Sequence, residues 1–196
     1  MRKSRTPLIA VLLLVTSLAL AGCSGWMASP TAQANDAIEK ANGALEKAAS
    51  YQEDVRTKVS SLDELPATAA GAGQGLSITS ELRETIAQEK TQLESAKLSM
   101  DGIAKIEVGD EYKQYAKLES SAIDTRITMT DTTLRLFDAM DVLYTSVKSG
   151  NSDVDPEQIQ AVIAQVKHEL SELGKQAEDE GQAARDFFDS IDLGGA

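Results

Sequence analysis

The sequence contains one cysteine, one histidine, one tryptophan and four prolines in 196 residues. A single cysteine excludes an internal disulfide, and with a single histidine it also excludes the multi-ligand sites that hold structural zinc. Only 4% of the residues are aromatic, whereas alanine, leucine, glutamate, glutamine and lysine are abundant, which is typical of helical proteins. There is no nucleophile elbow, phosphate loop or dinucleotide fingerprint, so we expect this chain not to be an enzyme.

Basic residues are also in the minority, because 19 lysines and arginines face 31 aspartates and glutamates and the net charge is −12. Loss of residues 1–22 would change the net charge to −15, since that segment holds three basic residues and no acidic one. Such a chain is repelled by nucleic acid phosphates and by anionic headgroups, so we expect no nucleic acid partner. The acidity keeps a protein solvated, or it attracts a cationic partner.

The N-terminal segment has the order of a secretory signal. Arg2, Lys3 and Arg5 are followed by an almost wholly apolar run from Pro7 to Leu20. This run is about 14 residues long, whereas a helix needs about 20 residues to span a bilayer. The segment therefore predicts export from the cytoplasm rather than a membrane span.

Leu20, Ala21, Gly22 and Cys23 end this run, and Cys23 is the only cysteine of the chain. The four residues resemble the lipobox of bacterial lipoproteins. The resemblance implies cleavage before Cys23 and attachment of several acyl chains, palmitate among them, to its thiol and new amino group, because one chain anchors a protein only marginally. It places the protein outside the cytoplasm, and Ser24, in place of an aspartate, indicates the outer membrane where the envelope has two. An ordinary signal peptide with an incidental cysteine is the alternative.

The mature chain shows four helical segments. Apolar residues recur at intervals of three and four from Pro30 to Leu65-Pro66, from about Ser77 to Ile103, from near Asp110 to Val147, and from Pro156 to Ile191. Glu89 falls on the second of these stripes, and the glycine-rich residues 67–75 predict a flexible connection. We predict an all-α, antiparallel up-down four-helix bundle with long helices, and a three-helix bundle with a loose first helix is the rival. The expected division is a signal peptide at 1–22, a lipidated tether at 23–29 and a helical bundle domain at 30–193.

Threonines crowd the middle of the third segment. Thr125, Thr128 and Thr132 surround Ile127, and β-branched residues are mediocre helix formers, but both flanks favour one continuous helix. These three threonines are candidates to line a polar ligand pocket inside the bundle. In the alternative, they face water or donate hydrogen bonds to carbonyls of their own helix.

The candidate metal and cofactor sites are incomplete. His168 and Glu172 are spaced as a metal pair, but His168 is turned about 200° from Val166, so it is expected to face solvent. A di-iron site needs Glu-x-x-His motifs, and no cysteine-linked haem motif is present. Residues 151–157 alternate oxygen-bearing side chains like a calcium loop, yet the sixth and twelfth positions, Pro156 and Val162, do not fit one. We therefore predict no metal and no cofactor, and we interpret Asp155-Pro156 as a helix N-cap.

These observations favour a membrane-anchored, non-catalytic interaction module that binds a cell-envelope component or an envelope protein. The layout of a lipobox followed by long helices resembles that of helical lipoproteins proposed to bind the cell wall. The alternative is a small-molecule sensor or carrier with its ligand inside the bundle. The oligomeric state stays open, because the apolar residues Leu98, Leu136 and Phe188 fit either a dimer face or a wide core stripe.

Overall fold

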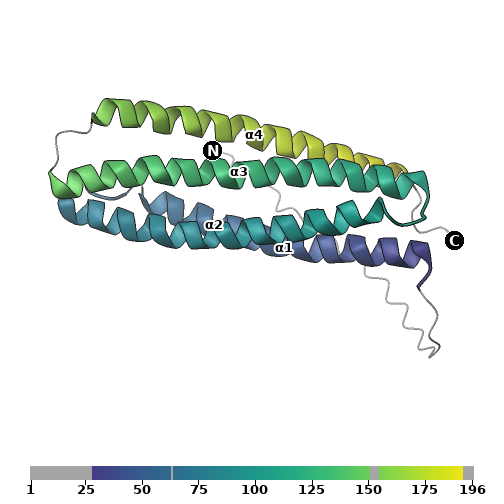
Figure 1. Cartoon of the computed structure of the whole chain (residues 1–196). Helices are drawn as coiled ribbons and strands as arrows, with labels where there is room; N and C mark the ends of the chain where they lie inside the picture. The colour runs from purple at the N-terminus through teal and green to yellow at the C-terminus, as the bar shows by residue number, and fades with distance from the viewer. Residues whose placement is uncertain (1–27, 63, 151–154, 192–196) are drawn as a thin grey trace, which may run out of the picture.

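The computed structural model describes residues 28–62, 64–150 and 155–191, and this part of the chain consists of four helices and no strand (Figure 1). The helices are α1 (Pro30–Leu62), α2 (Ala69–Ile103), α3 (Asp110–Ser149) and α4 (Pro156–Ser190). Short connections make successive helices antiparallel, as in an up-down bundle. The predicted fold class is confirmed, and the 40 residues of α3 give a length of about 60 Å at 1.5 Å per residue.

Side chains cap the starts of α1, α2 and α4, whereas α3 begins after Gly109 without a side-chain cap. The Ser29 hydroxyl accepts a hydrogen bond from the amide of Ala32 at 3.2 Å, just ahead of the predicted start at Pro30. Asp155 accepts from the amide of Glu157 at 3.0 Å, and Pro156 occupies the first turn of α4, which confirms the predicted N-cap. The rest of the calcium-loop candidate, residues 151–154, lies outside the described residues.

The predicted connection at residues 67–75 is wrong, because α2 begins at Ala69 and runs through all three of its glycines. Thr68 caps the helix by accepting a hydrogen bond from the amide of Gly71 at 3.2 Å. A Cβ atom on Gly71 would collide with the carbonyl oxygen of Pro66, and one on Gly75 would lie within 3 Å of the Tyr144 ring. These two glycines therefore permit close approach of neighbouring backbone and side chain rather than flexibility.

The buried apolar side chains form two clusters. The closed-end cluster lies where α1 and α3 begin and α2 and α4 end, and all four helices contribute to it. The open-end cluster lies at the opposite end and consists of Leu62, Leu82, Ile86 and Phe137, with partly buried neighbours from α1, α2, α3 and the α1–α2 connection. Among the described residues, α4 contributes nothing to the open-end cluster. The fully buried members of the closed-end cluster are Ala34, Ala41, Ala44, Ala48, Leu93, Ala96, Met100, Ile103, Tyr112, Tyr115, Ala116, Ile123 and Ala184.

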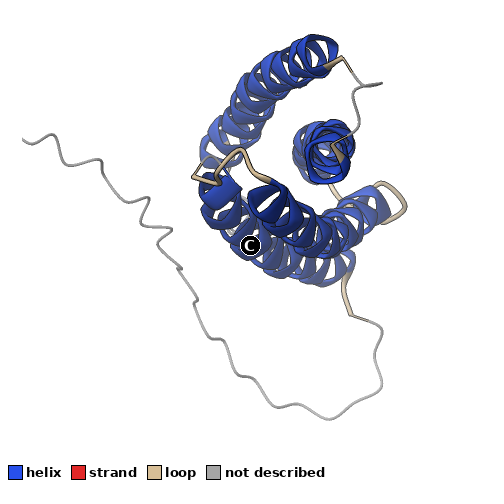
Figure 2. Cartoon of the chain, turned by 90° about the vertical axis from the view of Figure 1, so that its left-hand side faces the viewer, coloured by secondary structure: helices blue, strands red, loops and turns tan. Residues whose placement is uncertain are grey.

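The two ends differ in how much of α4 they bury, and along its whole length α4 packs on α3 with few contacts to α1. Extensive contact joins α1 to α2, α2 to α3 and α3 to α4, and the described part of the chain has no comparable α1–α4 pair. The first half of α4 buries only Val166, whereas the second half buries Ala177, Gly181 and Ala184. Figure 2 views the molecule from the open end, where the ribbons are spread rather than gathered into a square.

Candidate functional site

Charged side chains lie between the two apolar clusters, at the middle of the bundle. On α2, Glu89 occupies the inward stripe between Ile86 of the open-end cluster and Leu93 of the closed-end cluster. All three residues follow one another at intervals of three and four, so they share one face of the helix. The carboxylate is only partly exposed. A charge therefore interrupts the stripe that should be apolar throughout.

The neighbouring helix α3 adds two more inward charges. Glu119 and Arg126 are seven residues apart, and Arg126 is eleven residues before the fully buried Phe137. These spacings place the three side chains on one face of α3, which is the face turned to the core. Both charged side chains are partly buried. With Glu89 they bring charges of both signs into the bundle.

Two guanidinium groups approach a buried glycine of α4 at ordinary van der Waals distance. A Cβ atom on the buried Gly181 would lie 3.8 Å from Nη2 of Arg126 and 3.5 Å from Nη1 of Arg185. Two guanidinium groups, one from α3 and one from α4, therefore converge on this glycine. We call Glu89, Glu119, Arg126 and Arg185 the interior charged layer.

The two carboxylates of this layer, Glu89 and Glu119, have raised pKa values. Burial raises the pKa of Glu89 to about 7, and the charge of Arg126 opposes that rise. Burial also raises the pKa of Glu119, against the opposing charges of Arg126 and Arg185. Within the described residues, no hydrogen bond and no ion pair within 4.0 Å joins either carboxylate to a partner. Glu89 and Glu119 therefore make no direct ion pair with Arg126 or Arg185, and the carboxyl of Glu89 can exchange a proton near neutral pH.

Tyr115 forms the wall of the layer on the closed-end side. Its ring packs against Phe188 of α4 with centroids 5.1 Å apart, and only 8% of the residue is exposed. Burial, together with the charge of Glu119, raises the pKa of its phenol to about 12. Its hydroxyl therefore stays protonated at physiological pH. Phe188, one of the apolar residues outside the main stripe, has a packing role through this contact.

The predicted ligand-lining threonines do not share one pocket. Thr125 is buried, and its hydroxyl donates a hydrogen bond to Glu180 at 2.6 Å and accepts one from Gln176 at 3.3 Å. Thr132 is buried two turns further along the same side of α3. Thr128 is exposed and donates to a carbonyl of its own helix at 3.0 Å. Two of the three threonines thus lie on the side of α3 that packs on α4, and the third faces away.

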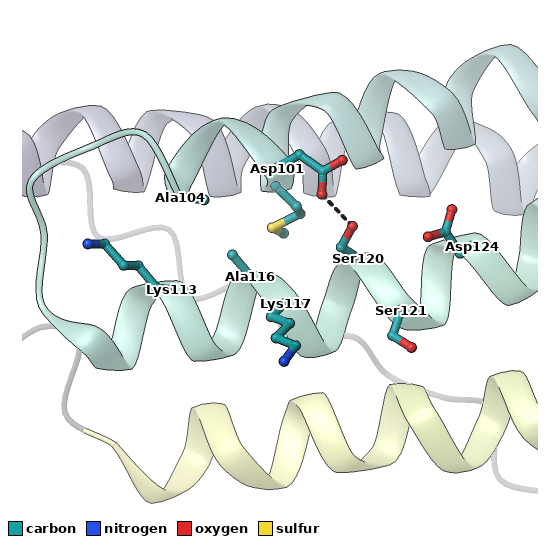
Figure 3. A pocket seen from close by; sticks show the side chains of 9 residues that line it. Asp101, Ala104, Lys113, Ala116, Lys117, Ser120, Ser121 and Asp124 are labelled. Atoms are coloured by element: carbon teal, nitrogen blue, oxygen red, sulfur yellow. Dashed lines mark hydrogen bonds between the residues drawn. The ribbon is translucent and has the colours of Figure 1, made fainter.

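A shallow surface groove of about 590 Å³ lies between the end of α2 and the start of α3 (Figure 3). Across it, the Ser120 hydroxyl donates to Asp101 at 2.6 Å, and Lys97 contacts the carboxylates of Asp101 at 2.8 Å and Asp124 at 3.4 Å. The hydrogen bonds from Lys97 and Ser120 lower the pKa of Asp101. The polar groups of Lys97, Asp101 and Ser120 are thus partnered, and this network links α2 to α3.

The two residues of the candidate metal pair, His168 and Glu172, lie at the exposed surface of α4. His168 is exposed, as the spacing from Val166 predicts, and Glu172 pairs instead with Lys175 at 2.8 Å. In the described part of the chain, no three histidine, cysteine or acidic side chains are grouped as metal ligands are. The helices seen there are also too polar along their length to cross a bilayer. Leu20, Ala21, Gly22 and Cys23 lie outside the described residues.

Sequence reasoning missed the interior charged layer. The signal for Glu89 was its place on an apolar stripe, and Glu119 and Arg126 carry the same signal through their spacing to Phe137. No known family model matches the chain, and no curated protein or solved structure is significantly similar to it. The function is therefore argued from the residues and their geometry alone.

Proposed function

We propose that this chain is a lipid-anchored, extracytoplasmic lipoprotein whose bundle is a non-catalytic interaction module for a cell-envelope component or protein. The observation that carries the proposal is the place of Cys23, which precedes Pro30 by only seven residues. Since α1 begins at the closed end, an anchor at Cys23 keeps that end near the membrane and leaves the open end to reach outward. In an envelope with two membranes, Ser24 favours anchoring in the outer one.

The anchor is tested by replacing its acceptor. Cells expressing the chain or its Cys23→Ala variant are fed an alkyne-bearing palmitate and then separated into membrane and soluble fractions. We expect label and membrane association for the chain and neither for the variant, because acylation requires the thiol. Equal labelling of both proteins, or of neither, would contradict the anchor.

The interaction role is tested by cross-linking in intact cells and purification of the lipidated protein. We expect a recurrent protein or glycan adduct, and retention on purified peptidoglycan if that adduct belongs to the wall. A protein that is recovered repeatedly as a monomer without adducts would contradict the interaction module. The Cys23→Ala variant is the control for adducts that form without the membrane anchor.

The interior charged layer favours a second candidate, a sensor or carrier that binds a small ligand within the bundle. Its half-buried carboxylates and converging guanidinium groups are the inward polar groups that such a site requires. A thermal-shift screen with small organic cations tests it, and the binder must lose its effect in Glu89→Gln. A screen without any shift would remove this candidate.

A further inference from the structure

The open half of the bundle has an incompletely covered side. Val55 and Val59 of α1 remain partly exposed although they pack on the open-end cluster. On α4, Ile163 and Leu170 are also only partly buried. We call the side between these four residues the seam. It exists because α4 packs on α3 there without packing closely on α1.

The seam and the interior charged layer face the same interior. Ile163 precedes Gly181 by 18 residues, which is five helical turns, so both lie on one side of α4. Gly181 is the residue on which the guanidinium groups of Arg126 and Arg185 converge. A segment lying along the seam would therefore meet apolar side chains first and the charged layer at its inner end.

The charges around the seam select the sign of its occupant. Helix α4 carries eight acidic residues against two lysines and one arginine, and the whole chain has a net charge of −12. The layer itself holds two half-buried carboxylates without direct cationic partners. A second copy of this chain would bring the same excess of negative charge, so repulsion disfavours it. A cationic segment is complementary to the acidic excess of α4 and of the whole chain, and its charges can pair with the two carboxylates that lack a direct ion pair.

We propose that the seam receives a cationic amphipathic helix of a partner protein, whose lysine or arginine side chains pair directly with Glu89 and Glu119. Apolar side chains of that helix pack on the residues of the seam, as in other helix-in-groove complexes. The buried ion pairs fix its register along the bundle, the best-attested role of polar groups at helix interfaces. This inference rests on the proposed interaction role and specifies its partner.

The contact is tested with the full lipidated chain in detergent and an 18-residue helical peptide of leucine and lysine. Its matched control has glutamate in place of every lysine. A photo-reactive phenylalanine analogue is placed at Ile163 in one sample and at Leu98 of α2, which is 75% exposed, in the other. We expect the lysine peptide to cross-link at Ile163 and not at Leu98, and the glutamate peptide at neither. Equal cross-linking at both positions would overturn the seam as the site.

The role of the carboxylates is tested by two double variants with the same change in net charge. Glu89→Gln with Glu119→Gln removes both interior charges, whereas Glu84→Gln with Glu178→Gln removes two exposed ones. We expect the Kd of the lysine peptide to rise at least about tenfold in the interior variant and less than about twofold in the surface variant. Equal weakening would show unspecific attraction to an acidic surface and overturn the pairing.

Two further outcomes separate this inference from the broader proposal. Spermidine that binds with the same Kd as the peptide, and with the same loss in the interior variant, would overturn a helix as the occupant. A partner captured in cells that cross-links only outside the seam would overturn the inference and leave the interaction module standing. If no adduct is recovered from cells, both this inference and the proposed interaction module are contradicted.

Discussion

The fate of a single polar residue in this bundle depends on which side of its helix it occupies. Thr128 and Thr125 are three residues apart, yet the first faces solvent and the second is buried in a hydrogen-bond network with α4. Glu84 and Glu89 are five residues apart on α2, and only Glu89 lies on the inward stripe. Composition alone therefore does not show which threonines and glutamates face the interior of the bundle.

Glu89 predicts a pH dependence of stability. The carboxyl binds its proton more tightly in the folded chain, where its pKa is about 7, than in the unfolded chain, where it is about 4.3. Its contribution to stability is therefore full below about pH 4.3 and is lost as the pH rises through 7. At pH 8 we expect Glu89→Gln to unfold at a higher urea concentration than the parent, with a free energy of unfolding about 1–2 kcal/mol larger after allowance for partial exposure. At pH 4.5 we expect the two proteins to have the same free energy of unfolding.

The control for this prediction is Glu84→Gln, which removes an exposed charge from the same helix. Its difference from the parent should stay nearly constant between pH 4.5 and pH 8, because its side chain lies in solvent rather than in the interior of the bundle. A Glu89→Gln difference that does not change over the same range would contradict the buried state of this carboxyl.

At the scale of the element, helix α2 shows how tertiary contacts redefine a sequence pattern. Glycines at 71, 73 and 75 predict a loop because glycine lowers the stability of isolated helices. In the bundle, Gly71 meets the carbonyl of Pro66, Gly75 meets the ring of Tyr144, and Gly73 has open space beside it. Close contacts thus explain two of the three glycines, one with the α1–α2 connection five residues earlier and one with a ring that is distant in sequence.

This difference between neighbouring glycines predicts opposite effects of one substitution. We expect Gly71→Ala to destabilise the chain by about 1–3 kcal/mol, because its Cβ collides with backbone that cannot move cheaply. Gly73→Ala is expected to stabilise it by about 0.4–1 kcal/mol, since the space is open and alanine favours a helix. Urea denaturation of both variants checks the sign, and two equal shifts would mean that Gly71 does not approach Pro66.

The start of helix α4 was the best-defined local feature of the sequence. The order of Asp155 and Pro156 combines a capping side chain with a residue suited to the first turn, and the structure places both in those roles. The helix boundaries at Pro30, Ile103 and Asp110 agree with apolar spacing for the same reason. Local chemistry thus located the start of α4, whereas it misplaced the start of α2 and does not say which helices meet.

At the scale of the whole molecule, the bundle is unevenly stabilised. All four helices bury side chains at the closed end, and only three contribute to the cluster at the open end. Sequence periodicity predicted four apolar stripes, with a loose first helix as the alternative, but the pairing of helices depends on contacts across the fold. The spread of the open end was therefore beyond reach of the sequence alone, whereas the interior charged layer had a signal in the spacing of its residues along the apolar stripes.

Uneven burial predicts uneven protection of amide hydrogens. Residues 160–167 of α4 bury only Val166, whereas residues 178–185 bury Gly181 and Ala184 beside the closed-end cluster. We expect the amides of the first segment to exchange at least roughly tenfold faster than those of the second, since local opening exposes less apolar surface. Residues 130–137 of α3, which bury Thr130, Thr132, Leu136 and Phe137, are the control and should stay protected.

Equal protection along α4 would contradict the spread of the open end. The same measurement can be repeated with the lysine-containing peptide. A peptide bound in the seam should slow amide exchange in residues 160–167 and leave exchange in residues 178–185 unchanged.

An even number of antiparallel helices brings the start of α1 and the end of α4 to the same pole of the molecule. A fluorescent protein fused after the last residue would consequently sit beside the start of α1 and leave the opposite pole unobstructed. Imaging or affinity tags belong at this position, and an insertion into the α3–α4 connection would instead sterically block the far pole.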